Sequence, residues 1–205
     1  MKNVFLGEYI KQRRLDLGLT QEQLCDGICE PMTLSRLENG KQTPSRNRIN
    51  ALLQRLGLPD DRYFALLSKN ELEMEALQKE IVACNANHRV EEGFETLKKF
   101  EQIADHDDQI AQQFILRSKV LLGRLDQRYT PQEQIDLLMQ AIRLTVPRFN
   151  LDEIERFFYS TDEIKIINQI GIAYSDDGQN KKAADIYYQL LKYVRKHFEE
   201  TITSV

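Results

Sequence analysis

Apolar residues recur along this chain at intervals of three and four positions, the spacing that places side chains on one face of a helix. In the first third of the chain these apolar stripes are short. Leu24 and Ile28 form one stripe and Leu34 and Leu37 form the next, so two short helices can pack against each other. A stripe through residues 49–56 predicts a further helix. The pattern therefore indicates a compact bundle of short helices.

From residue 70 onward the apolar stripes belong to longer helices. We expect helices over residues 70–87, 90–104, 107–123, 130–145, 150–159, 164–174 and 180–200. Three of their starts show the capping box, in which a cap residue and a glutamate bond each other's backbone: Thr130 with Glu133, Asn150 with Glu153, and Ser160 with Glu163. The first of these helices is either a linker or the first helix of a second domain.

Residues 165–193, KIINQIGIAYSDDGQNKKAADIYYQLLKY, form the clearest pair of consecutive helices. Gly171 and Ala183 are small where the two helices would cross, and Tyr174 and Tyr187 fill the space beside them. The unit resembles a tetratricopeptide repeat, an antiparallel helix pair that stacks on its neighbours. Paired helices with little glycine also fit an ordinary helical bundle.

Composition supports an all-helical protein, with 41% hydrophobic and 29% charged residues, no tryptophan, and few prolines and glycines. Residues 1–58 hold nine basic and six acidic side chains, whereas the remainder holds nineteen and twenty-six. A mildly basic segment on an acidic one suits a nucleic-acid reader with a second partner, although the balance is also ordinary scatter. No apolar run reaches membrane-span length and no signal sequence opens the chain. We therefore expect a cytoplasmic protein without a membrane partner.

The sequence contains no pattern that supports catalysis, a cofactor or a metal site. It has no glycine-rich phosphate loop and no Ser/His/Asp order, and its three histidines are far apart. Cys25, Cys29 and Cys84 do not form a set of metal ligands. The first two are four residues apart, so they are either small apolar groups in the core or a redox pair. We expect a binding protein rather than an enzyme.

Residues 20–45, TQEQLCDGICEPMTLSRLENGKQTPS, have the pattern of two helices joined by a tight turn. Thr20 and Gln23 form a capping box for the first helix, and Pro31 suits the first turn of the second. Gly40 suits the end of that second helix. Its outer face presents small polar side chains and one arginine, a surface that a DNA major groove accepts.

Residues 6–58 resemble the DNA-binding domain of the Xre/Cro class, and the short turn ICEPMTLSRLENG resembles the Rgg and PlcR branch of peptide-responsive regulators, grouped as RRNPP. The resemblance implies an all-α protein with a five-helix, lambda-repressor-like helix-turn-helix domain over residues 1–67. A linker helix over 68–88 and tetratricopeptide-like helical repeats over 89–205 would follow. Such proteins usually carry more repeats than this chain, which implies either a short member or a missing C-terminal part.

The resemblance places the second helix of the pair in the major groove of operator DNA. Arg36 is the expected base reader, with Met32 and Thr33 beside it, because arginine matches guanine O6 and N7. The alternative for Arg36 is a surface ion pair with Glu30 or Glu38. Phosphate contacts are expected from Arg14, Gln21, Lys41, Ser45 and Arg46. A homodimer on two half-sites of double-stranded DNA is expected.

The resemblance also implies that the helical repeats bind a short signalling peptide on a concave face. The candidate contacts, from the first helix of each pair, are Gln112, Lys119, Lys165, Asn168, Ile172 and Ser175. Asn168 is the first choice, because an amide can hold a peptide N–H and C=O together, and the alternative is a solvent-facing or helix-capping amide. Two other functions stay open. One is a protein-interaction adaptor whose first domain dimerises rather than reads DNA, and the other is a DNA-binding repressor whose repeats serve only for dimerisation.

Overall fold

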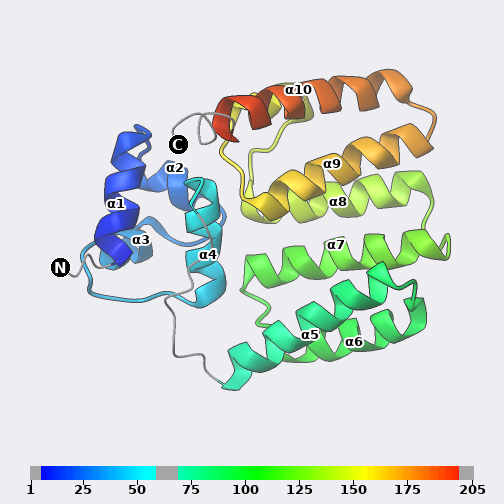
Figure 1. The fold of residues 1–205 in the computed structure, drawn as a ribbon, viewed down its shortest axis with the longest axis horizontal. Coiled ribbons are helices and arrows are strands. Elements are labelled where there is room, and N and C mark those ends of the chain that lie inside the picture. The colour runs from blue at the N-terminus through cyan, green and yellow to red at the C-terminus, as the bar shows by residue number, and fades with distance from the viewer. Residues whose placement is uncertain (1–5, 59–68, 199–205) are drawn as a thin grey trace.

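The computed structural model describes residues 6–58 and 69–198, and every regular element in these two ranges is a helix. The head, residues 6–58, contains α1 (Leu6–Asp16), α2 (Gln21–Cys25), α3 (Pro31–Glu38) and α4 (Arg46–Arg55) (Figure 1). The body, residues 69–198, contains α5 (Lys69–Ala86), α6 (Val90–Ile103), α7 (Gln109–Leu125), α8 (Pro131–Thr145), the 3-10 helix η1 (Leu151–Arg156), α9 (Thr161–Asp176) and α10 (Asn180–Phe198). The expected fifth head helix and the boundary between residues 67 and 68 lie outside the described residues.

The head is a bundle of short helices around an aliphatic core. Each helix contributes at least one fully buried side chain, among them Ile10, Leu24, Leu34 and Ile49. α1 crosses α3 at Gly7, where an added β-carbon would overlap the backbone of Leu37. The short apolar stripes of the sequence are thus the faces that meet in this core.

Capping signals set the first residues of several helices, as the sequence predicts. Thr20 and Gln23 bond each other's backbone at the start of α2. The same reciprocal bonds start two body helices: Thr130 with Glu133 at α8, and Ser160 with Glu163 at α9. α3 begins at Pro31, the position expected for a residue that lacks a backbone N–H.

The capping box expected at residue 150 is wrong. The Asn150 side chain accepts a hydrogen bond from the N–H of Asp152 instead of residue 153. Glu153 leaves the helical conformation, with φ −134°, and its carboxylate binds Arg156 at 2.9 Å. The segment is therefore a short 3-10 helix that ends at Arg156, and it does not continue as a helix to residue 159.

The body stacks three antiparallel helix pairs, α5 with α6, α7 with α8, and α9 with α10 (Figure 1). α5 packs along α6, so Lys69–Ala86 is the first helix of the body, the second of the two alternatives that the sequence left open for this segment. Where α9 crosses α10, Gly171 lies against the ring of Tyr187, and Ala183 is buried. This is the packing expected of a tetratricopeptide-like pair. None of the described helices is long and apolar enough to cross a membrane.

Arg55, the last residue of α4, joins the head to the body. Its guanidinium donates hydrogen bonds to the carbonyl oxygens of Leu24 at 3.1 Å and Asp26 at 2.6 Å, both in the head. On the body side it donates to the Thr145 carbonyl at 2.6 Å and to the Glu163 carboxylate at 2.8 Å. Both side chains of the ion pair are 2% exposed. A desolvated and well-bonded ion pair thus sets the position of the head on the body.

The body side of this junction is itself a buried polar network. Thr145 Oγ1 donates to Glu163 at 2.6 Å and accepts from Gln113 Nε2 at 2.6 Å. Gly27, with φ +73°, lies against the backbone of Thr145, where a β-carbon would overlap it. The turn between α2 and α3 therefore approaches the end of α8 as closely as glycine permits.

Candidate nucleic-acid interface and neighbouring groove

Helix α3 lies at the surface of the head with one face buried and the other exposed. Leu34 and Leu37 anchor it in the core. Met32 is 63% exposed, Arg36 is exposed, and Thr33 is half-buried on the same side of the helix. The structure thus brings the three expected base-reading residues together on one short helix.

The body borders this face near the start of α3. Thr33 and Arg48 of the head line a cavity of about 300 Å³ together with Asp107, Gln109 and Pro147 of the body. A ligand on the outer face of α3 would therefore approach the turn that precedes α7. This proximity was not expected from the sequence, because the lining residues come from distant segments.

Glu38, one of the two acidic partners considered for Arg36, is buried and binds other side chains. Arg14 donates to its two oxygens at 2.6 Å and 3.0 Å, and Gln21 Nε2 donates to it at 2.7 Å. Arg36 forms no ion pair within the described residues. Its guanidinium is therefore available to a ligand outside the chain.

The structure does not support the expected phosphate contact of Arg14. This side chain is in the head interior, with the residue 7% exposed, and Nη1 donates to the Leu19 carbonyl at 2.7 Å. The hydrogen bonds with Glu38 raise the pKa of Arg14, so the guanidinium stays charged in this site. Gln21 is half-buried and bonds the same carboxylate. The Arg14–Glu38 pair fastens α1 to α3, and Gln21 adds α2 to the same network.

The remaining phosphate candidates lie in three different environments. Lys41, just after α3, is exposed. Ser45 precedes α4, and its Oγ is buried without a hydrogen-bond partner in the described part of the chain. Arg46 Nη1 lies 3.1 Å from the carboxylate of Glu75 on α5, so its charge is directed at the body. Lys41 is the candidate whose charge the structure leaves to solvent.

The six residues expected to contact a peptide are spread over several sites. Lys119 Nζ lies 2.7 Å from Glu101 of α6, and Gln112 donates to the Asp105 carbonyl at 3.2 Å. The other four lie along α9: Lys165, Asn168, Ile172 and Ser175. Of the six, Lys165 lines the groove that separates the body from the head. The structure does not gather the set around one ligand, because Lys119 and Gln112 are directed to neighbouring parts of α6 and its following turn.

A groove of about 480 Å³ lies between α4 of the head and helices α5, α7 and α9 of the body. Asn50 lines its head wall, and Val82, Phe114 and Arg117 line its body walls. Asn50 and Arg117 were not predicted as site residues. No local signal marks them, since the walls of the groove come from segments that meet only in the folded chain.

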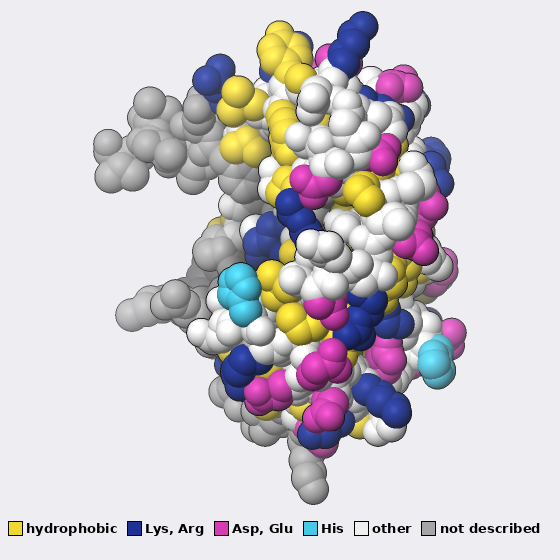
Figure 2. Space-filling view, turned by 90° about the vertical axis from the view of Figure 1, so that its right-hand side faces the viewer, with side chains coloured by type: hydrophobic (Ala, Val, Ile, Leu, Met, Phe, Trp, Pro, Cys, Tyr) yellow, Lys and Arg dark blue, Asp and Glu magenta, His cyan; other side chains and the backbone are white. Residues whose placement is uncertain are grey.

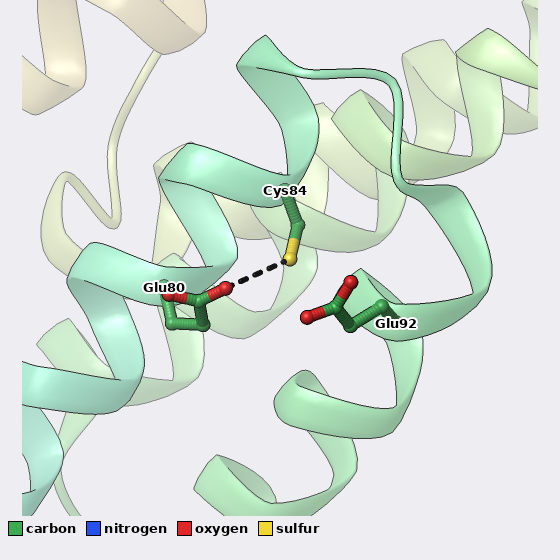
Figure 3. A group of neighbouring side chains, drawn as sticks. All are labelled: Glu80, Cys84 and Glu92. Atoms are coloured by element: carbon green, nitrogen blue, oxygen red, sulfur yellow. Dashed lines mark hydrogen bonds between the residues drawn. The ribbon is translucent and has the colours of Figure 1, made fainter.

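Glu80, Cys84 and Glu92 form a compact cluster between α5 and α6, with ligand atoms within 4.8 Å of one another (Figure 3). Arg89 binds both carboxylates, at 3.0 Å to Glu80 and 2.7 Å to Glu92. Burial raises the pKa of the Cys84 thiol, which donates to Glu80 at 3.5 Å and is thereby kept protonated. An arginine already neutralises the acidic pair, so we assign no metal ion to this cluster.

The end of the body that faces away from the head carries a mixed surface. Figure 2 shows basic and acidic side chains interspersed over this end. A nucleic-acid interface would concentrate cations on one face. The candidate interface therefore stays with α3 of the head.

Comparison with known proteins supports this assignment of the head. Residues 6–63 match a family described as a helix-turn-helix domain. The crystal structure of Bacillus thuringiensis PlcR in complex with the peptide PapR7 and DNA matches with 22% identity and a TM-score of 0.50, over 94% of this chain and 65% of that chain. The Streptococcus dysgalactiae pheromone receptor Rgg2, as its C45S variant, matches with 16% identity and a TM-score of 0.34, over 97% and 81% of the two chains.

No curated protein sequence matches the chain. The chain spans about two thirds of the length of the PlcR structure, at 65%. The expected resemblance to PlcR is confirmed at the level of the fold: residues 6–63 match a helix-turn-helix family, and the described part of the chain has a PlcR-like helical fold.

Proposed function

We propose that this chain is a DNA-binding transcriptional regulator whose helical body senses a short peptide. The observation that carries the proposal is the exposed face of α3, which lies in the segment that matches a helix-turn-helix family. Leu34 and Leu37 hold the helix, while Met32 and Arg36 stand outward. An exposed arginine that forms no ion pair in the described ranges suits bidentate bonding to guanine.

The partners follow from the same arrangement. One such head covers few base pairs, so the regulator acts as a homodimer on half-sites about 34 Å apart. Peptide sensing by the body is supported by its stacked helix pairs and by the likeness in fold to PlcR, which was crystallised with a peptide and DNA. The chain acts in the cytoplasm, by binding rather than by catalysis, and without a cofactor.

The first test is a selection of bound sequences from a random double-stranded DNA library by the full chain. The enriched site is then measured by fluorescence anisotropy beside a scrambled site at two salt concentrations. Arg36→Ala should weaken binding to the enriched site by about 1–3 kcal/mol, the scale of one bidentate base contact, and should relax selectivity at one position. Arg143→Ala, a change of an exposed arginine on α8, is the matched control and should leave affinity unchanged. Equal affinity of wild type and Arg36→Ala would reject α3 as the reading helix.

An adaptor function is the alternative, and one observation favours it. Tyr188 and Leu191 are exposed three residues apart on α10, where a protein partner would find apolar contact area. The adaptor predicts no enriched DNA site and no salt-dependent binding. The same selection experiment therefore separates the two functions.

A further inference from the structure

The groove between the head and the body contains a cation that the protein neutralises poorly. The Arg117 side chain is 16% exposed, yet its nearest acidic atom, Asp162 Oδ1, is 3.5 Å from Nη1. Its Nε donates to Gln169 at 3.3 Å. Asp162 also binds Lys165 Nζ at 3.0 Å, so one carboxylate is shared between two cations. Burial lowers the pKa of Arg117, as expected for a desolvated guanidinium with an incomplete set of acceptors.

The opposite wall of the groove contains an acceptor without a donor. Asn50 of α4 lines the groove, and its Oδ1 is buried with no hydrogen-bond partner among the described residues. A buried amide oxygen left without a donor is unfavourable, so such groups usually meet a partner in a bound molecule or ordered water. The two walls thus have unused bonding capacity: Arg117 has one long ion pair with a carboxylate that it shares with Lys165, and Asn50 Oδ1 has no donor.

Apolar surface lies on the body walls of the same groove. Phe114 and Val82 line it from α7 and α5, and Val82 is exposed although it is a large aliphatic residue. The volume of about 480 Å³ is within the range of sites for small ligands, about 300–1,000 Å³. A ligand that fits would have a carboxylate, a neighbouring N–H and an apolar side chain.

We propose that this groove binds the C-terminal end of a short peptide, with the terminal carboxylate on Arg117 and a peptide N–H on Asn50. A C-terminal apolar side chain packs against Phe114 and Val82. The inference rests on the proposed function and deepens it, because it names the peptide terminus that is recognised and places it between α4 and the first turns of α9 rather than along the rest of α9.

The position of the groove makes the bound terminus sensitive to the head. Thr145 and Glu163 also line the groove, and they are the body residues that hold Arg55 of α4. A peptide that touches α4 and α7 together binds with different affinities when the head is docked and when it is displaced. This difference is the requirement for coupling peptide binding to DNA binding.

The test uses the full chain and a randomised heptapeptide library, prepared as C-terminal free acids and, in parallel, as C-terminal amides. Each enriched free-acid peptide is then labelled at its N-terminus and measured by anisotropy as the acid and as the amide. We expect the amide to bind about ten- to a hundred-fold more weakly, because it loses a charge-assisted pair with a guanidinium. Arg117→Gln should abolish this preference, and Arg117→Lys should retain part of it.

Two further variants separate the groove from other sites. Asn50→Ala should lower the affinity for the free-acid peptide several-fold, since the peptide N–H then loses its acceptor. Lys99→Gln is the matched control, because Lys99 is exposed on α6 and does not line the groove. Thermal melting of each variant checks that it folds like wild type.

Three outcomes would overturn the inference. The groove is rejected as the peptide site if peptides bind with equal affinity as acid and amide. It is also rejected if their affinity is unchanged in a folded Arg117→Gln variant. If their binding is instead lost in Asn168→Ala, peptide sensing survives at α9. If neither library yields a binder while the chain still selects a DNA site, both the groove and peptide sensing fail and DNA reading stands.

Discussion

The exposed face of α3 and the junction between α4 and the body use arginine in opposite ways. Arg36 is exposed and forms no ion pair with another described residue, so its bonding capacity is directed outward. Arg55 is buried, and its guanidinium bonds four residues, two in the head and two in the body. Removing the Arg36 side chain should lower the affinity for DNA and change the free energy of unfolding little. Disturbing the bonds of Arg55 should lower the free energy of unfolding and release the head from its position on the body.

The comparison of Arg36 with Arg55 also shows how burial changes the free-energy cost of an arginine without a partner. An exposed arginine is hydrated and costs little when it has no partner, but a buried one needs every acceptor it has. Arg117 lies between these cases, since it is largely buried and its acidic partner is shared. A largely buried guanidinium whose acidic partner is shared can still bind an anion, and this indicates a ligand site in the groove.

Breaking the junction should give the largest effect. Glu163→Ala leaves Arg55 buried without its carboxylate and removes the capping box of α9, so the free energy of unfolding should fall by about 3–5 kcal/mol. Urea denaturation followed by circular dichroism measures it. Glu153→Ala, which breaks the exposed pair with Arg156, is the control and should change stability by about 0.5 kcal/mol or less. Similar denaturation midpoints for the two variants would show that the buried pair does not hold the junction.

A pair of glycines sharpens the comparison further. Gly27 and Gly57 have nearly equal φ angles, +73° and +68°, so alanine at either position should cost about 1–2 kcal/mol from backbone strain. Gly27 alone of the two contacts the body, at Thr145, whereas Gly57 has open space around its α-carbon. Gly27→Ala should therefore destabilise by an additional amount of about 1–3 kcal/mol, because the close packing must open. Equal denaturation midpoints for the two alanine variants would contradict this. They would indicate that the turn between α2 and α3 can move away from α8 without lowering the free energy of unfolding.

A smaller effect is expected at the edge of the α3 face. Lys41→Ala removes an exposed cation, so it should lower the affinity for all DNA sequences by a similar factor. It should also reduce the slope of log affinity against log salt by about one. Anisotropy titrations of the selected and scrambled sites over a salt series measure that slope. Lys98→Ala, an exposed lysine on α6, is the comparison that should leave it unchanged. An unchanged slope in Lys41→Ala would remove this residue from the interface.

The smallest effect concerns two cysteines at the turn before α3. A hydrogen bond from the Cys25 thiol lowers the pKa of Cys29, and Cys29 is half-buried while Cys25 is buried. Because the thiolate is the reactive form, iodoacetamide at neutral pH should modify Cys29 before Cys25. Cys25→Ala removes the donor, which raises the pKa of Cys29 and slows its alkylation. Mass spectrometry of timed samples follows both sites, and equal rates in wild type would contradict this ordering.

Local signals predicted the elements well where the deciding groups are neighbours in the chain. The boxes at Thr20, Thr130 and Ser160 formed as expected, since each joins residues three apart. The same reasoning failed at Asn150, where the Glu153 carboxylate bonds Arg156 and its backbone leaves the helical region. Short-range rules hold only when no neighbouring partner competes for the same carboxylate.

Sequence reasoning was weakest for charged residues, because their roles depend on what the fold places beside them. Arg14 and Arg36 have similar polar surroundings in the sequence, yet one is buried against Glu38 and the other is exposed. Asn50 and Arg117 attracted no attention, since neither belongs to a motif. Their proposed role in ligand binding depends on a groove whose walls lie on helices far apart in the chain.

The sequence by itself determined most of the helices and the caps at Thr20, Thr130 and Ser160, because periodicity and capping act over one or two turns. It also determined that α3 presents Met32 and Arg36 opposite Leu34 and Leu37, since helical geometry assigns those faces. The tertiary structure decided which arginines are buried, how Arg55 fastens the head to Glu163, and where the groove forms. Those outcomes require contacts across as many as 108 residues, which no local pattern encodes.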